Sequence, residues 1–179
     1  LQYTWLRSLM KRHVDFWQLT TDALDYALDT VGVSDPALRQ KLLDLYLQLD
    51  AYVEVKDVLT ALKDAGLKTA ILSNGSPDML TSAVQNAGLD KLLDVSLSVE
   101  DVGIYKPDPS VYQMALDHFS ITPQEVSFQS SNAWDAAGAA TFGFRVVWVN
   151  RFDQAPERLP DQPDFEVKTL SELPGILGI

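Results

Sequence analysis

The segment from Ala70 to Leu80, AILSNGSPDML, indicates the fold of this chain. Its first residues are apolar, as in a buried strand that ends at Ser73, and Pro77 begins a stretch with helical spacing. The residues from Ser73 to Ser76 are small and polar. Small polar residues at the carboxyl end of a parallel strand are where open α/β sheets bind ligands. The segment therefore predicts a strand, a binding loop and a helix in succession.

The same alternation of helix and strand continues along the chain after Tyr52. Strands are predicted at residues 67–73, 94–99, 125–131 and 145–150. Helices are predicted at residues 55–66, 77–88, 109–119, 132–143 and 170–177, with a polar, proline-rich surface loop at 153–164. Alternating helices and strands indicate a parallel sheet with right-handed crossovers. We therefore expect an α/β fold with a Rossmann-like core.

The first fifty residues have a different pattern, with apolar side chains at helical spacing and no strand signal. Helices are expected at residues 3–12, 20–32 and 34–49, the last preceded by the capping sequence Ser34-Asp35-Pro36. We therefore divide the chain into a helical subdomain at residues 1–52 and the Rossmann-like core at residues 53–179.

Composition excludes several classes of function. Hydrophobic residues make up 46% of the chain, and the formal net charge is -11. Nucleic acid and anionic membrane surfaces are not expected as partners, because phosphate binding needs clustered Lys and Arg. The chain has no cysteine and two histidines, so we expect neither disulfides nor a thiolate or His-rich metal site. No Gly-x-Gly-x-x-Gly motif or P-loop follows a strand, so we expect no nucleotide cofactor.

Three polar clusters lie at or beyond strand ends. In the first, Ser73 and Asn74 with the following helix N-terminus suit a carboxylate or phosphate, whereas Ser76 is expected only to cap the helix. In the second, YKPDPSVY, Lys106 is either a solvated loop lysine or a cation that neutralises a carboxylate in a cleft. Tyr112 has the pattern of a half-buried core residue.

The third cluster is SSNAWDAAGAA. Asn132 and Asp135 are spaced almost as a capping box, which is the structural interpretation. The functional interpretation places Ser130, Asn132 and Asp135 around a water, with Asp135 as the proton acceptor. Trp134 would wall an apolar pocket. The small residues that follow, Gly138 among them, predict close packing of this helix on the sheet.

Taken together and in this order, the segments AILSNGSPDML, YKPDPSVY, SSNAWDAAGAATFGF and WVNR resemble the L-2-haloacid dehalogenases of the haloacid dehalogenase (HAD) superfamily. The resemblance covers essentially the whole chain. It implies a Rossmann-like core with a helical cap at residues 1–52, and hydrolysis of short L-2-haloalkanoic acids to D-2-hydroxyacids through an aspartyl ester. It also implies a metal-independent reaction without a cofactor. We further expect a cytoplasmic homodimer with a small 2-haloacid as its substrate.

The resemblance also implies roles for individual residues. The substrate carboxylate would be bound by Ser73 and Asn74. The apolar pocket for the substrate side chain and halogen would be lined by Leu1, Phe16 and Trp134, with Asn132 near the halide. Lys106 would pair with the nucleophile. The nucleophile and the hydrolytic water would be ordered by Tyr112, Ser130, Asn132 and Asp135.

The chain departs from the family at its beginning. The family's nucleophilic Asp lies in an Asp-x-x-Gly-Thr motif on the first core strand, and its halide-binding Arg lies before a segment like LQYTW, with which this chain starts. We therefore expect that an N-terminal segment is lacking and that residues 1–179 alone are inactive. We also expect a slot between strands 67–73 and 125–131, faced by the polar clusters, or a sheet completed by another chain.

Two alternatives remain open from the sequence. One is a Mg²⁺-dependent HAD phosphatase, in which Gly-Asp-x-x-x-Asp would stand at the third cluster. Here Ser131-Asn132 occupy the place of the first acid and only Asp135 remains. The other alternative is a non-catalytic fragment that binds small acids.

Overall fold

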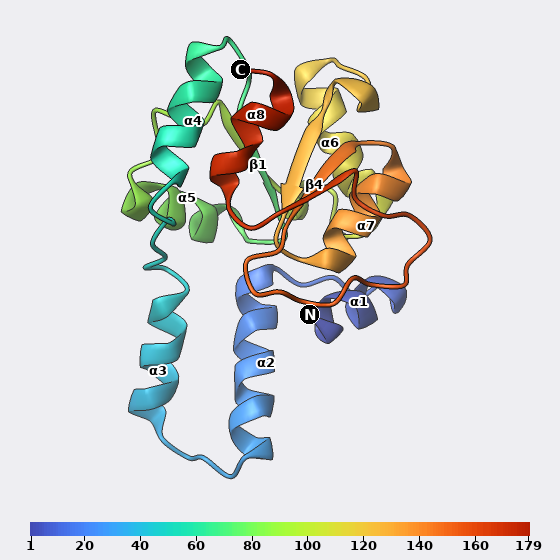
Figure 1. Cartoon of the computed structure of the whole chain (residues 1–179). Coiled ribbons are helices and arrows are strands. Elements are labelled where there is room, and N and C mark those ends of the chain that lie inside the picture. The colour runs from blue at the N-terminus through green and yellow to red at the C-terminus, as the bar shows by residue number, and fades with distance from the viewer. The chain divides into compact units, whose positions relative to one another are not determined.

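A computed structural model describes residues 1–179, and these form two units, each made of two segments of the chain (Figure 1). The first unit contains Leu1–Ala51 and Ala70–Tyr105, and the second contains Tyr52–Thr69 and Lys106–Ile179. Both units combine helices with parallel strands. The predicted α/β class is therefore confirmed.

The first unit begins with three helices and continues with a two-stranded sheet. Its elements are α1 (Gln2–Leu9), α2 (Phe16–Thr30), α3 (Pro36–Leu45), β1 (Ala70–Ser73), α5 (Pro77–Ala87), β2 (Val95–Ser98) and the 3₁₀ helix η1 (Val99–Asp101). Helices α2 and α3 lie side by side and run in opposite directions (Figure 1). Asp15 and Asp35 cap them by accepting hydrogen bonds from backbone N–H groups of the first turn. Strands β1 and β2 are parallel, with Ser73 opposite Ser98.

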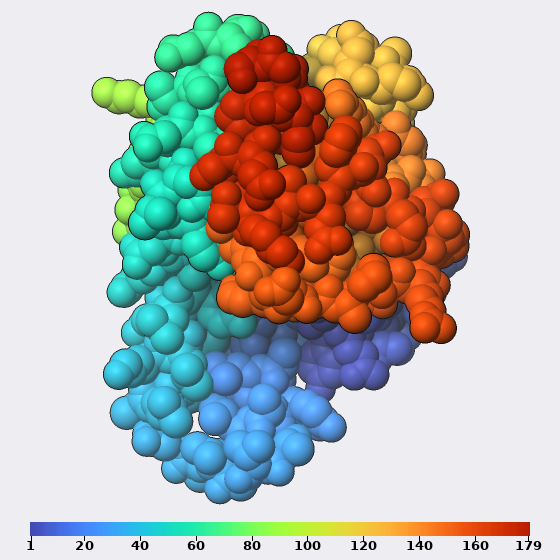
Figure 2. Space-filling view, viewed as in Figure 1, coloured from blue at the N-terminus to red at the C-terminus, as the bar shows by residue number.

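The second unit holds a three-stranded parallel sheet in the order β3-β4-β5. Its elements are α4 (Val55–Asp64), α6 (Pro109–Phe119), η2 (Pro123–Glu125), β3 (Ser127–Ser130), α7 (Ala133–Phe142), β4 (Arg145–Val149), β5 (Phe165–Val167), η3 (Leu170–Glu172) and α8 (Leu173–Leu177). Side chains of α4 and α8 pack with β4 and β5 in one apolar cluster, formed by Val58, Leu62, Val147, Val149, Val167 and Leu173. Figure 2 shows α8 lying directly against α4.

The predicted elements are present, but several have different ends. Residues 67–69 are not part of β1, and residues 125–126 are not part of β3. Helix α2 begins at Phe16, earlier than expected, because Asp15 caps it. The sequence shows no strand signal for β5, although Phe165–Val167, just after the predicted loop at residues 153–164, pairs with Val147–Val149. This strand is three residues long and includes Glu166, so it lacks the apolar pattern of β4.

Strands β1 and β3 are not neighbours in either sheet. The slot between them, and the division into a cap at residues 1–52 and a core at 53–179, stay predictions. None of the helices is both long and apolar enough to cross a membrane.

Candidate active site

The carboxylate of Asp135 is the centre of a buried hydrogen-bond network in the second unit. Asp135 lies in the first turn of α7 and is 5% exposed. Its Oδ2 accepts from Lys106 Nζ at 3.1 Å and from Ser130 Oγ at 3.0 Å, and its Oδ1 accepts from Tyr112 OH at 2.9 Å. Strand β3 ends at Ser130 and α7 begins shortly after it, so Ser130 and Asp135 lie at the same edge of the sheet.

Lys106 is buried, with 6% of its surface exposed, so the interpretation as a solvated loop lysine is wrong. Its ammonium group lies over the ring of Phe128, 4.8 Å from the centroid, in a favourable cation–π position. Burial lowers the pKa of Lys106, and the Asp135 charge and hydrogen bond oppose that shift. A buried carboxylate needs such a partner, because an unpaired charge in the interior is costly.

Tyr112 is fully buried in a cluster of aromatic rings, deeper than the half-buried position that its pattern predicts. Its ring lies 5.7 to 5.9 Å from those of Phe128, Phe142 and Phe144. Burial first, and then the Asp135 charge, raise the pKa of the Tyr112 hydroxyl. At neutral pH this hydroxyl is therefore a neutral donor to Asp135, and the three phenylalanine rings packed around Tyr112 fix its position.

The Asp135 carboxylate keeps room for one more donor. A carboxylate offers about four lone-pair sites, two on each oxygen. Oδ2 accepts two hydrogen bonds and Oδ1 accepts one from a side chain. A water molecule that donates to Oδ1 would thus fill the remaining acceptor site, and it could pass its proton to the Asp135 carboxylate.

Asn132 takes part in this site through its backbone. Its N–H donates to Ser130 Oγ at 3.2 Å, and the residue is exposed to solvent. Asn132 is the N-cap residue of α7, but its side chain makes no capping hydrogen bond. The capping-box interpretation of Asn132 and Asp135 is therefore wrong, because the Asp135 side chain bonds to Lys106, Tyr112 and Ser130 instead.

Trp134 lines a cavity of about 420 Å³ in the second unit. Most of the lining is apolar, and it consists of Pro107, Pro109, Tyr112, Trp134, Ala137, Gly138, Thr141, Phe142, Leu159 and Pro160. The segment at Leu159 and Pro160 is held by Thr141 Oγ1, which donates to Asp161 Oδ2 at 2.8 Å.

The polar loop after β1 belongs to the first unit and is fixed by its own hydrogen bonds. Ser73 Oγ accepts from the Gly75 N–H at 3.0 Å, and Ser98 Oγ donates to the Gly75 carbonyl oxygen at 2.8 Å. Ser73 therefore has a turn-forming role that the sequence did not indicate. Ser76 is the N-cap residue of α5, as expected, although its side chain makes no capping hydrogen bond. Asn74 is partly buried beside them.

The other two predicted pocket residues also lie in the first unit. Leu1 is 58% exposed, and its carbonyl oxygen accepts from Thr4 Oγ1 at 2.6 Å. The Phe16 N–H donates to Glu100 Oε1 at 2.9 Å, and its ring centroid lies 6.0 Å from that of Tyr105. The structure thus brings Lys106, Tyr112, Ser130 and Asp135 into contact. The convergence of Leu1, Phe16, Ser73 and Asn74 on the same site stays a prediction.

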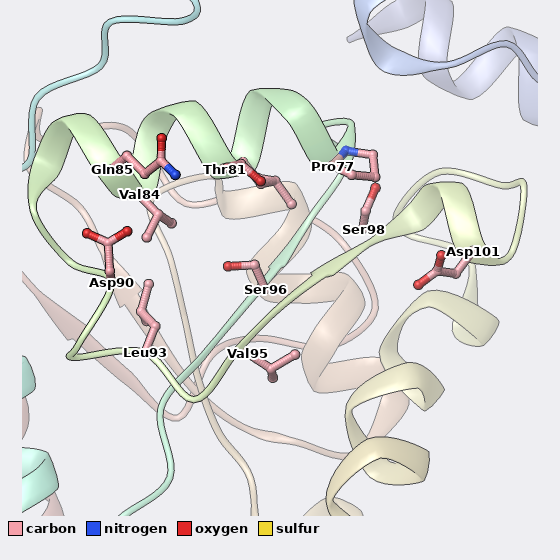
Figure 3. Close-up of a pocket in the computed structure, with 11 residues that line it drawn as sticks. Pro77, Thr81, Val84, Gln85, Asp90, Leu93, Val95, Ser96, Ser98 and Asp101 are labelled. Atoms are coloured by element: carbon pink, nitrogen blue, oxygen red, sulfur yellow. The ribbon is translucent and has the colours of Figure 1, made fainter.

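A second cavity of about 460 Å³ lies in the first unit between α5 and β2 (Figure 3). Thr81 and Val84 of α5 face Ser96 of β2 across it, and Asp90 and Asp101 lie at its two ends. None of the residues predicted to act in the site lines this cavity. We assign it no role in the chemistry.

Comparison with known proteins identifies relatives over the whole chain. A family model described as haloacid dehalogenase-like hydrolase matches residues 2–143. The (S)-2-haloacid dehalogenase 1 of a Pseudomonas species is 48% identical over 178 residues, which are 99% of this chain and 78% of that protein. The structure of L-2-haloacid dehalogenase from Xanthobacter autotrophicus aligns with a TM-score of 0.92 at 37% identity, over 99% of this chain and 81% of that one. A HAD phosphatase from Thermococcus onnurineus aligns with a TM-score of 0.65 at 24% identity, over 91% of this chain and 88% of that one, a likeness of fold alone.

Proposed function

The chain belongs to the (S)-2-haloacid dehalogenases, within the haloacid dehalogenase-like hydrolases, and we propose on this basis that it acts in the hydrolysis of short L-2-haloalkanoic acids to D-2-hydroxyacids. The observation that carries the proposal is the Asp135 carboxylate, buried with three donors and one acceptor site left. Such a group can bind a water and take its proton.

The reaction has two steps. In the first, a carboxylate oxygen forms a bond to C2 of the substrate on the side opposite the halogen, and the carbon–halogen bond breaks with inversion. In the second, water attacks the carbonyl carbon of the resulting ester and its proton passes to Asp135. The bond between that carbon and the ester oxygen then breaks, and the leaving alkoxide takes the proton from Asp135 to give the hydroxyacid. Residues 1–179 contain no Asp-x-x-Gly-Thr segment, so we assign the attacking carboxylate to no residue among them.

The other residues of the family pattern would bind and orient the substrate. Ser73 and Asn74, at the end of β1, offer hydroxyl and amide groups to the substrate carboxylate. Leu1, Phe16 and Trp134 would form the apolar pocket for its side chain and halogen, with Asn132 beside the leaving halide. Lys106 supplies the positive charge that pairs with the Asp135 carboxylate in this buried site.

A stereochemical assay tests the proposed function. The full-length protein should release halide from L-2-chloropropionate and form D-lactate, with the D-substrate left unchanged. Residues 1–179 alone should release none above a buffer blank, since the ester needs a carboxylate that they do not provide. Halide release by residues 1–179 alone would contradict this mechanism, and a full-length protein inert towards both enantiomers would contradict the function.

The assembly and the location are part of the same proposal. We expect a cytoplasmic homodimer in which residues 1–52 form the helical cap. Support for a dimer comes from large apolar side chains exposed on α2, α3 and the residues after them, including Tyr26, Val31, Leu45 and Leu49. The absence of cysteine means that folding needs no oxidising compartment. Light scattering at micromolar concentration should give twice the protomer mass, and a monomer mass would contradict the dimer.

A further inference from the structure

Gly138 lies one helical turn after Asp135, on the same face of α7, and it faces two of the three segments that hold the Asp135 carboxylate, α6 with Tyr112 and the Lys106–Pro107 segment. A Cβ atom at this position would lie 2.7 Å from Tyr112 OH and 2.7 Å from Pro107 Cβ. Both distances are shorter than real Cβ atoms show, so a side chain here must displace its neighbours. Helix α7 packs on β3 and β4, as its small residues predict, but Gly138 itself faces α6 and the segment before it.

The backbone of Gly138 gives no reason for a glycine. Its φ does not lie in the left-handed region, unlike those of Gly88 and Gly143, which end helices. Alanine forms helices better than glycine. By helix propensity alone, alanine at position 138 would stabilise α7, and the neighbouring positions do carry alanine, Ala137 and Ala139.

Neither neighbour of Gly138 can move without affecting Asp135. The Tyr112 ring is fully buried among three phenylalanine rings, so it has little room to retreat. Its hydroxyl is the donor to Asp135 Oδ1. Pro107 is exposed and can shift outward, but it is bonded directly to Lys106, the donor to Oδ2.

We propose that Gly138 is a positioning residue for the hydrolytic step, because the absence of a side chain lets Tyr112 and the Lys106–Pro107 segment close on Asp135 together. This inference rests on the proposed function. Gly138 makes no contact with the substrate in this proposal. It acts through Lys106 and Tyr112, whose hydrogen bonds orient the Asp135 carboxylate and so set the direction of the lone pair that accepts from water.

The test is Gly138→Ala in the full-length protein. A catalytic group misplaced by about 1 Å loses ~10²-fold in rate, so we expect kcat to fall by ~10²-fold with KM near the wild-type value. In the Tyr112→Phe background, the same substitution should cost less, because the hydroxyl that it meets is gone. The matched control is Gly175→Ala on α8, where a Cβ meets nothing within 4 Å and the φ is not positive, and it should keep the wild-type kcat.

A crystal structure of the Gly138→Ala variant separates this inference from the proposed function. The Tyr112 OH to Asp135 Oδ1 distance should lengthen beyond hydrogen-bond reach, from the 2.9 Å seen here, whether or not the wild type releases halide. An unchanged distance, or an unchanged kcat in an active enzyme, would overturn the positioning role. Equal losses in the wild-type and Tyr112→Phe backgrounds would overturn it as well.

Discussion

Strands β1 and β3 end in the same local structure, but the segments after them differ. Both strands end in a serine whose Oγ accepts a backbone N–H two residues later, at 3.0 Å for Ser73 and 3.2 Å for Ser130. After β3, Ser130 also donates to Asp135, and a buried lysine completes the network. After β1, the hydrogen bonds of Ser73 and Ser98 hold a neutral backbone turn at Gly75. In our proposal, the same type of serine turn supports proton transfer at the end of β3 and carboxylate binding at the end of β1.

Removing the cation should have the largest effect. Lys106→Met leaves the buried Asp135 carboxylate without its charge partner, and breaking a buried pair in this way costs ~3–5 kcal/mol of unfolding free energy. Urea denaturation of the full-length protein measures the loss. Lys168→Met is the matched control, because Lys168 is half exposed and its surface pair with Asp153 contributes little. Equal losses for the two variants would show that the β3 site is not the charged centre described above.

The two serines should affect different kinetic constants. A hydrogen bond to a charged group is worth ~1.5–3 kcal/mol, which corresponds to ~10–10²-fold. Ser130→Ala weakens the Asp135 network and should lower kcat by that factor. In our proposal Ser73 binds the substrate carboxylate, so Ser73→Ala should mainly raise KM. Steady-state halide release gives both constants, and the same profile for both variants would abolish the distinction between the two strand ends.

A smaller effect is expected for the serine that supports the turn after β1. Ser98→Ala leaves the Gly75 carbonyl oxygen without its side-chain donor, at a cost of ~0.5–1.5 kcal/mol in unfolding free energy. Ser96→Ala, two residues earlier on the same strand and exposed, is the control and should be neutral (Figure 3). Loss of stability in the Ser96→Ala variant alone would refute the assignment of Ser98 as the support of the turn.

No effect is expected from chelation. With Asp135 as its last residue, the phosphatase pattern Gly-Asp-x-x-x-Asp places Ser131 at the first acid and Ser130 at the glycine. Dialysis of the full-length protein against EDTA should therefore leave halide release unchanged. Loss of turnover, restored by Mg²⁺, would instead support the phosphatase-like alternative for the β3 site.

The sequence predicted the fold class and the α-helices and strands between Val55 and Val149, because apolar segments at helical and strand spacing alternate there, although several of these elements have different ends. It missed β5, which is short and depends on pairing with β4. It named Lys106, Tyr112, Ser130 and Asp135, but it did not predict that Lys106 bonds directly to Asp135. That contact joins residues 29 positions apart, and no local pattern encodes it.

The contribution of Gly138 was equally hidden in the sequence. Among four alanines, a glycine in a helix indicates only close packing. Which groups it packs against depends on how α6 lies on α7, and this is a tertiary property. The hydroxyl of Tyr112 and the ring of Pro107 become its neighbours only in the folded chain.

The most direct test of the role of Asp135 is rapid-quench mass spectrometry of the full-length Asp135→Asn variant with L-2-chloropropionate. Removing a general base typically slows its step by ~10²–10⁴-fold, so ester hydrolysis should slow far more than halide displacement. We expect a burst of chloride equal to the enzyme concentration and an accumulated lactyl ester on the protein. Equal slowing of both steps, with no trapped ester, would contradict the claim that Asp135 activates the hydrolytic water.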